Sequence, residues 1–303
     1  KKGSRLLCQR VEVKYDFIRW QQKAYPVTVL CRVMLVSRSS YYQYLKQQQT
    51  PDCLQQRKLE ALVKTIHKAS KESYGSRRIS EALQGHGYPI GRYQARSLMR
   101  KLNLVAKPTK RFKITTDSNH NHPVAPNLLN RQFQVDRPDT VWASDITYLW
   151  THQGWLYVAV ILDLFSRKVV GWSIDRRMTS ELVKKALNMA VMYRQPPKGL
   201  LHHSDRGSQY ASHAYQEELR KHGMVCSMSR KGNCWDNAVV ERFFRSLKTE
   251  QTNHYRYVSR DAARRDVVDY ILMFYNSQRL HSTLGYRSPA DFEAKYQQLQ
   301  NVA

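Results

Sequence analysis

The stretch that decides the fold is VWASDITYLWTHQGWLYVAVILDLFSRKVVGWSI, residues 141–174. It contains three runs of β-branched and aromatic residues, separated by short turns, at 141–150, 155–165 and 168–174. Runs of this composition between turn residues are typical of β-strands. We therefore expect three consecutive strands to open a domain at about residue 141.

Helices and strands alternate after these three strands. Apolar residues recur at helical spacing in four segments, and two short apolar runs lie between them. Three strands followed by such an alternation describe an α/β domain with a mixed five-stranded sheet and flanking helices. The further strands are expected at 200–203 and 224–228, and the helices at 181–193, 209–222, 238–249 and 261–275.

The residues before 141 predict only helices. Residues 27–36 and 37–45 form a helix, a tight turn and a second helix, with Ser37 as a plausible N-cap. This pattern suits a helix-turn-helix that contacts DNA, and it suits an ordinary helical pair equally well. Thr50-Pro51-Asp52 breaks it and starts a second unit. Helices of that unit are expected at 54–72, 76–85 and 92–102.

The last helix of the second unit is strongly basic. A trihelical unit with a basic last helix is the usual way to place side chains in the major groove of DNA. The alternative is an ordinary basic face in contact with solvent. The candidate DNA-binding residues on this helix are Arg92, Arg96, Arg100 and Lys101.

Charge points to a polyanionic partner. The chain holds 50 Lys and Arg against 24 Asp and Glu, a formal net charge of +26. Residues 1–140 carry 27 of these bases against only 9 acids, so the amino-terminal half is the main electrostatic footprint. A field of this size attracts nucleic acid and speeds its encounter with the protein.

The cysteines indicate a reducing compartment. There are five of them, none in a C-x-x-C pair, and an odd number argues against a disulfide framework. No apolar run reaches the roughly 18 residues of a membrane span. We therefore expect a cytoplasmic protein.

Two acids lie on or directly after expected strands. Asp145 is in the middle of the first strand, where burial of a lone ionised carboxylate is costly and implies a partner such as a metal ion. An exposed position on an edge strand is the alternative. Asp205 follows the strand 200–203, at the strand end where functional groups gather in open α/β sheets. An ordinary turn aspartate is the alternative there.

A third acid, Glu241, lies on the helix expected at 238–249 and shares one face with Arg245 and Lys248. Alone, this pattern is that of a surface ion pair. Together, three carboxylates suit Mg²⁺ or Mn²⁺. Two such ions, about 3.5–4 Å apart, activate an attacking oxygen and stabilise a leaving one in phosphoryl transfer.

The spacing of these acids and the motifs around them resemble a known family. Thirty-five residues separate Asp205 from Glu241, and Lys248 follows seven residues later. This chain is similar to the D,D(35)E transposases and retroviral integrases, and most similar to the second-frame product of the IS3 family of bacterial insertion sequences. The resemblance covers nearly the whole chain. Its other motifs are WASD at 142–145, HSDRGSQY at 203–210, NCWDNA at 233–238 and YNSQRLHSTLGYRSP at 275–289.

The resemblance implies an RNase H-like catalytic core and direct transfer between phosphodiesters. Asp145, Asp205 and Glu241 would be both the catalytic residues and the ligands of two Mg²⁺ or Mn²⁺ ions per active site. A 3′ end of the element would be cut and then joined to other DNA without a covalent protein intermediate. Lys248 would contact DNA near the element tip. Weaker candidates for DNA contact are Arg245, Asn276, Arg279 and His281, and for His281 a packing role fits equally well.

The resemblance also implies partners and a domain order. The partners would be double-stranded DNA, as terminal inverted repeats and as target, and further copies of this chain, because two ends must meet. The location would be the bacterial cytoplasm at the nucleoid. Full proteins of the family are often frameshift fusions with a further helix-turn-helix and a leucine zipper, neither evident in residues 1–50, so we expect Lys1 to lie near the fusion point. The expected divisions are a helix-turn-helix-like segment (1–50), a trihelical DNA-binding domain (51–106), a basic linker (107–138), the catalytic core (139–256) and a helical extension (257–303).

Three other functions are compatible with parts of the pattern. A DNA-binding regulator with an inactive core predicts the loss of an acid, and all three acids are present. A hydrolytic nuclease of the same fold would cut DNA without joining it. A tyrosine recombinase would need a constellation of Arg, His and nucleophilic Tyr, which does not stand out among the 19 tyrosines.

Overall fold

The computed structural model describes residues 9–48, 51–108, 123–231 and 233–302, and its first unit is a small helical one. Helix α2 (Val11–Gln21) precedes the expected pair, α3 (Val27–Val33) and α4 (Arg38–Gln48). The three helices enclose a core that includes Ile18 and Tyr41, both fully buried. The residues expected to form a helix-turn-helix, 27–45, therefore do form two helices joined by a short turn.

The second unit matches the expected three helices. These are α5 (Pro51–Ala69), α6 (Ser76–Gly85) and α7 (Arg92–Lys101). Their apolar faces meet in a common core, in which the most buried members are Val63, Ile79, Leu83 and Ala95. Part of the expected linker, residues 109–122, lies outside the described residues.

The third unit is built on a mixed five-stranded sheet, as expected. The strand order is β3-β2-β1-β4-β5. The first three strands pair antiparallel, while β4 and β5 pair parallel to β1. Their bounds are β1 (Val141–Thr151), β2 (Gly154–Asp163), β3 (Val169–Asp175), β4 (Leu201–Ser204) and β5 (Val225–Met228).

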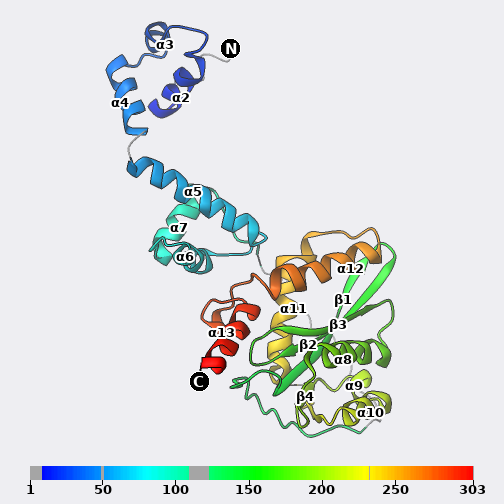
Figure 1. The fold of residues 1–303 in the computed structure, drawn as a ribbon. Helices are drawn as coiled ribbons and strands as arrows, with labels where there is room; N and C mark the ends of the chain where they lie inside the picture. The colour runs from blue at the N-terminus through cyan, green and yellow to red at the C-terminus, as the bar shows by residue number, and fades with distance from the viewer. Residues whose placement is uncertain (1–8, 49–50, 109–122, 232, 303) are drawn as a thin grey trace.

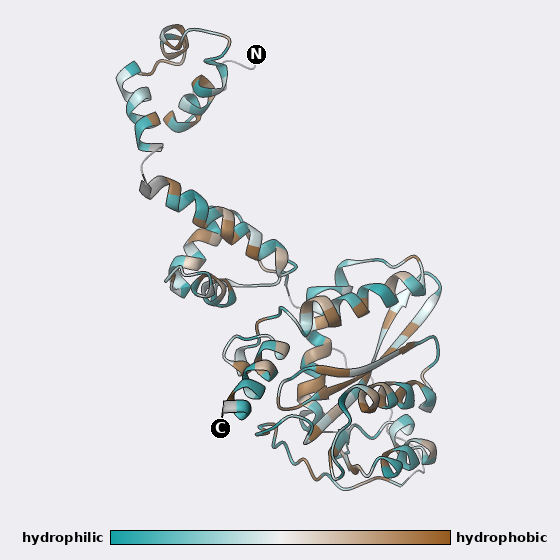
Figure 2. Cartoon of the chain, in the orientation of Figure 1, coloured by the Kyte–Doolittle hydropathy of each residue, from teal (hydrophilic) through white to brown (hydrophobic). Residues whose placement is uncertain are grey.

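Helices cover both faces of this sheet (Figure 1). On one face, α8 (Ser180–Arg194) and α10 (His213–Lys221) pack against Trp142 and Ile161. Close contact of α8 requires Gly171, because a Cβ there would lie 2.4 Å from the carbonyl oxygen of Ala186. On the other face lie α11 (Ala238–Glu250) and α12 (Arg260–Asp269). Figure 2 shows hydrophobic residues concentrated on the strands between these layers.

Two expected helices are interrupted. The helix expected at 209–222 is divided into α9 (Ser208–Ala211) and α10, because Ser212 is extended (φ −62°, ψ 142°) and its side chain accepts a hydrogen bond from the Tyr215 N–H. The helix expected at 261–275 is α-helical only as far as Asp269. The remaining residues form the π-helix η3 (Tyr270–Tyr275). Apolar periodicity alone does not reveal either change.

The carboxyl-terminal segment joins the second helical unit to the core. The Leu280 N–H donates a hydrogen bond to the Tyr74 hydroxyl (2.6 Å), and Arg78 lies 3.8 Å from Glu250. The last helix, α13 (Pro289–Val302), presents Glu293 to Arg194 of α8 at 3.0 Å. None of the described helices is long and apolar enough to cross a membrane.

Candidate active site

Strand register brings the first two acids together. Strand β4 runs parallel to β1 and pairs Ala143 with His203. Asp145 and Asp205 each lie two residues further in the same direction, at the end of this pairing. Both side chains are half-buried. The sheet topology therefore places two carboxylates side by side, Asp145 within β1 and Asp205 just beyond the end of β4.

Backbone N–H groups orient these carboxylates. The Ile146 N–H donates to Oδ1 of Asp145 at 2.8 Å, and the Gly207 N–H donates to Oδ1 of Asp205 at 2.9 Å. A Cβ at residue 207 would lie 3.0 Å from that oxygen, so the glycine leaves room for the carboxylate.

Glu241 approaches from α11, which packs against β1. Burial raises the pKa of Asp145 well above its usual value, and Asp205 and Glu241 raise it further. Burial also raises the pKa of Glu241, with Asp205 adding to the effect and Arg245 opposing it. Three like charges that disfavour one another's ionisation create a site that a cation stabilises.

Lys248 completes the charged face of α11. Burial lowers the pKa of its ammonium group, while Asp145 opposes that shift. Its Nζ lies 5.2 Å from the ring centroid of Tyr148. It lines a cavity of about 480 Å³ with the exposed rings of Trp150, Trp155 and Tyr255. Aromatic surfaces beside a cation are typical of nucleic-acid contacts, and the sequence interpretation did not include them.

The donors fit hard divalent ions held by pairs of carboxylates. Within the described ranges, no three His, Cys, Asp or Glu side chains are close enough to form a single metal cage. Mg²⁺ is commonly bound through one or two carboxylates plus water and substrate phosphate, and does not need an all-protein cage. The mutual repulsion of the half-buried acids agrees with this mode of binding.

A buried acid that sequence reasoning missed supports the start of α11. Asp236 is fully buried and accepts hydrogen bonds from Arg230, Arg131 and Asn127, and these contacts hold its pKa well below the usual range. The neighbouring Asn237 donates to the carbonyl oxygen of Ser144 at 3.0 Å. The NCWDNA motif thus ties the start of the Glu241 helix to the Asp145 strand.

His202 and His203 of β4 are fully buried and serve the core. His202 contacts the Tyr215 hydroxyl at 3.0 Å, and His203 contacts Ser227 at 2.9 Å. Burial lowers their pKa values to about 3 and about 4. Neither is placed as a metal ligand.

These histidines predict acid sensitivity. Below the ordinary histidine pKa, the histidines of the unfolded chain bind protons while the buried ones of the folded chain stay neutral. Stability therefore falls as the pH drops from about 6.5 towards 4. A shift of this size is worth roughly 3 kcal/mol for one histidine. We expect His203→Gln to reduce the drop in the free energy of unfolding, measured in urea at several pH values. The control His213→Gln, at an exposed position, should leave the drop in unfolding free energy unchanged. An equal effect of the two substitutions would contradict the conclusion that His203 causes the acid sensitivity.

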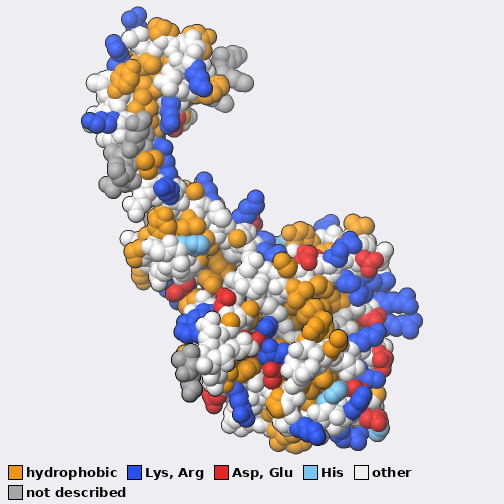
Figure 3. Space-filling model, viewed as in Figure 1, with side chains coloured by type: hydrophobic (Ala, Val, Ile, Leu, Met, Phe, Trp, Pro, Cys, Tyr) orange, Lys and Arg blue, Asp and Glu red, His pale blue; other side chains and the backbone are white. Residues whose placement is uncertain are grey.

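The basic helix of the second unit presents its arginines to solvent. Arg92, Arg96 and Arg100 are exposed, whereas Lys101 forms an ion pair with Glu60 at 2.7 Å. Figure 3 shows further Lys and Arg side chains over the helical units and along one edge of the core. The three arginines are thus placed where a phosphate backbone could meet them.

We expect Arg96→Gln and Arg100→Gln each to weaken duplex binding and to lower the slope of log K against log salt by about 1. Lys101→Gln should have a smaller effect, because Glu60 already neutralises that charge. Fluorescence anisotropy over a salt series measures both quantities. Arg220→Gln on α10 is the matched control, and an equal loss there would refute the groove-helix interpretation.

Two weaker DNA candidates are corrected by burial. Asn276 is 7% exposed and makes two hydrogen bonds with the backbone of Val169. Arg279 is 4% exposed and forms an ion pair with Glu250 at 2.7 Å. Both stabilise the interior and are not available to DNA. His281 is also nearly buried and bonds to Thr283, but its ring lines a cavity.

The chain matches three family descriptions. Two of them are integrase core domains, at residues 135–234 and 222–289, and one is an HTH-like domain at residues 54–112. It is 40% identical over 285 residues to the transposase InsF for insertion sequence IS3A of Escherichia coli (strain K12), covering 93% of this chain and 99% of that protein. It is 44% identical over 270 residues to an uncharacterized 31 kDa protein of insertion element IS600 of Shigella sonnei, covering 89% and 99%.

Solved structures of viral integrases are also similar. The simian T-cell lymphotropic virus intasome in complex with a PP2A regulatory subunit matches with a TM-score of 0.45 and 18% identity, over 78% of this chain and 74% of that one. The HTLV-2 integrase catalytic core domain in complex with magnesium matches with a TM-score of 0.41 and 19% identity, over 52% and 97%.

Proposed function

Since this chain belongs to the IS3 family of insertion-sequence transposases and is a DNA transposase with an RNase H-like integrase core, we propose that it cuts the 3′ ends of its element and joins them to DNA by metal-dependent phosphoryl transfer. The proposal includes the two partners of that reaction, the terminal inverted repeats and the target DNA. It also includes at least a dimer of this chain, because two ends must be held together.

The observation that supports the proposal is that three acids from three elements are near enough to affect one another's pKa. Asp145 comes from β1, Asp205 from the end of β4, and Glu241 from α11, and each influences the ionisation of another. Structural carboxylates usually find a basic partner, as Asp236 does with Arg230. At Asp145 the opposing cation is Lys248, while Asp205 and Glu241 both raise the pKa of that carboxyl group.

Asp145, Asp205 and Glu241 would hold the divalent ions, Mg²⁺ or Mn²⁺. Such ions, when bound in pairs, assist the attacking oxygen and the leaving oxygen of the phosphodiester. The chain itself orients the carboxylates through the Ile146 and Gly207 N–H groups. The fixed orientation lowers the cost of assembling the site when DNA arrives.

Cations on α11 would bind the DNA strand. Arg245 is exposed one turn beyond Glu241, and Lys248 lies beside the aromatic cavity of Tyr148 and Trp155. Both extend from the same helix face as the catalytic carboxylate. They would bind a phosphate next to the reacting one. The exposed arginines of α7 would bind phosphates of the duplex further away.

The test is a strand-transfer assay on labelled element ends with the full chain. We expect joined products with Mg²⁺ or Mn²⁺ and none after metal removal by EDTA, with activity restored when Mg²⁺ is added back. Cut ends without joined product would favour the hydrolytic nuclease. Binding without cutting in either metal would favour the regulator with an inactive core.

A further inference from the structure

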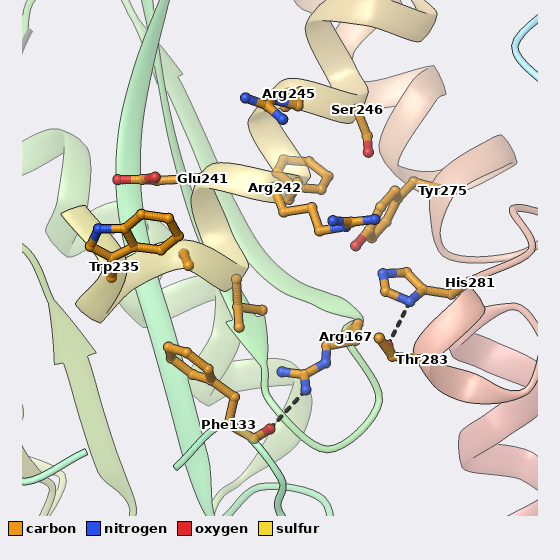
Figure 4. A pocket seen from close by; sticks show the side chains of 13 residues that line it. Phe133, Arg167, Trp235, Glu241, Arg242, Arg245, Ser246, Tyr275, His281 and Thr283 are labelled. Carbon is orange, nitrogen blue, oxygen red and sulfur yellow. Dashed lines mark hydrogen bonds between the residues drawn. The ribbon is translucent and has the colours of Figure 1, made fainter. Parts of the chain in front are cut away.

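A cavity of about 670 Å³ lies next to Glu241, on the side of α11 that faces the carboxyl-terminal segment (Figure 4). Its wall combines parts of the chain that are far apart in sequence: Phe133, Arg167, Trp235, Arg242 and His281. The volume lies within the range of about 300–1,000 Å³ that is usual for ligand pockets. Glu241 and Arg245 belong both to this cavity and to the candidate active site.

Among the described residues, no carboxylate forms an ion pair with Arg167. Its Nη2 donates to the carbonyl oxygen of Phe133 at 2.7 Å, but its Nη1 is buried and has no hydrogen-bond partner in that part of the chain. Asp163 lies nearby, yet its carboxylate accepts hydrogen bonds from backbone N–H groups and forms no ion pair with Arg167. An unsatisfied donor on a buried cation is costly, and Arg167 adds its positive charge to the wall of the cavity.

The cavity is positively charged overall. Arg242 and Arg245 also line it, and neither forms an ion pair within the described part of the chain. Glu241 is its single lining acid among the described residues. Figure 4 shows Arg242 extending towards Tyr275. Three guanidinium groups against one carboxylate favour a ligand that carries a phosphate.

The rest of the wall is apolar and aromatic. Phe133 and Val239 lie on it, and Trp235 stands at its edge with 69% of its surface exposed. Exposed tryptophan next to arginine is the arrangement on which nucleobases stack. Phosphate-binding groups and a stacking surface in one cavity match the two parts of a nucleotide.

We propose that this cavity binds one unpaired nucleotide of a DNA strand that passes Glu241. Arg242 receives the phosphate, Arg167 adds positive charge to the wall, and Trp235 and Phe133 receive the base. The inference rests on the proposed function, because that function brings a DNA strand to Glu241. It gives the carboxyl-terminal signature a role at the site, through the wall that His281 contributes.

The first test measures the binding of fluorescent oligothymidylate, and of a blunt duplex of equal length, by anisotropy in EDTA. We expect Arg242→Gln to weaken oligothymidylate binding about fivefold, against less than about twofold for Arg220→Gln, which removes an equal charge on the opposite side of the sheet. Trp235→Ala should weaken oligothymidylate binding about fivefold and leave duplex binding within about twofold. Equal losses in the two arginine variants, or an unaffected Trp235→Ala, would overturn the proposal.

The second test locates the contact. Oligothymidylate that carries 5-iodouracil should crosslink under light to peptides containing Trp235 or Phe133, and crosslinks only elsewhere would overturn the assignment. Thymidine 5′-monophosphate should compete for the cavity better than inorganic phosphate. Equal competition would show a simple anion site and would refute the nucleotide. Because no metal is present, these outcomes are independent of strand transfer: the pocket can fail while the wild-type chain still joins DNA.

Discussion

Asp205→Asn is expected to abolish the joining of element ends, with a loss of at least about a thousandfold in the rate. A catalytic metal ion contributes several kcal/mol to the transition state, and each 1.36 kcal/mol is a factor of ten. Removal of one of the three acids should therefore disable the site. Asp145→Asn and Glu241→Gln are expected to do the same in the strand-transfer assay.

The stability of these variants separates loss of chemistry from loss of fold. The three acids repel one another and are partly desolvated, so Asp145→Asn should leave the melting temperature unchanged or raise it. Duplex binding by the helical units should persist. Asp261→Asn removes an exposed acid from α12 and should retain full activity. Joining of DNA by Asp145→Asn at the parental rate would refute the assignment.

Glu250→Gln is expected to lower the free energy of unfolding by about 3–5 kcal/mol, because it leaves the buried guanidinium of Arg279 without its counterion. Glu250 receives three hydrogen bonds from Arg279 at 2.7–3.1 Å and a fourth from the Tyr270 hydroxyl at 2.6 Å. The contact joins α11 to the carboxyl-terminal segment. Urea denaturation of the full chain measures the change.

A surface pair provides the control. Glu181→Gln removes the partner of Lys184 on α8, where solvent screens the charges, and should leave the free energy of unfolding nearly unchanged. The double variant Glu250→Gln with Arg279→Met should recover part of the loss, because it removes both buried charges. A Glu250→Gln variant as stable as the parent would show that this ion pair does not hold the segment.

The placement of Arg279 changes the interpretation of the carboxyl-terminal motif. Resemblance suggested contacts with the DNA tip for Asn276 and Arg279, yet these side chains hold β3 and α11 in place. Only His281, of the three weaker candidates in this motif, lines a cavity near Glu241. Through these contacts the motif stabilises the packing of β3 and of α11, the helix that carries Glu241.

The sequence by itself predicted most of the helices and strands and singled out three candidate acids. Strand composition at 141–174 predicted three strands, and helical periodicity predicted the units before residue 107, because both patterns are local. Asp145, Asp205 and Glu241 were each ambiguous alone. Their combination and the family resemblance of their spacing predicted a shared metal site. The observed helix boundaries differ from the expected ones where a capping residue interrupts the helix, as Ser212 does.

Only the tertiary structure decided which charged side chains are buried and which residues share a cavity. Asn276 and Arg279 look like polar surface residues in the sequence, since nothing local reports that Val169 and Glu250 will enclose them. Arg167 and Trp235 lie 68 positions apart in the sequence. Their meeting depends on the packing of α11 across the sheet, and long-range packing has no periodicity that a single sequence can display.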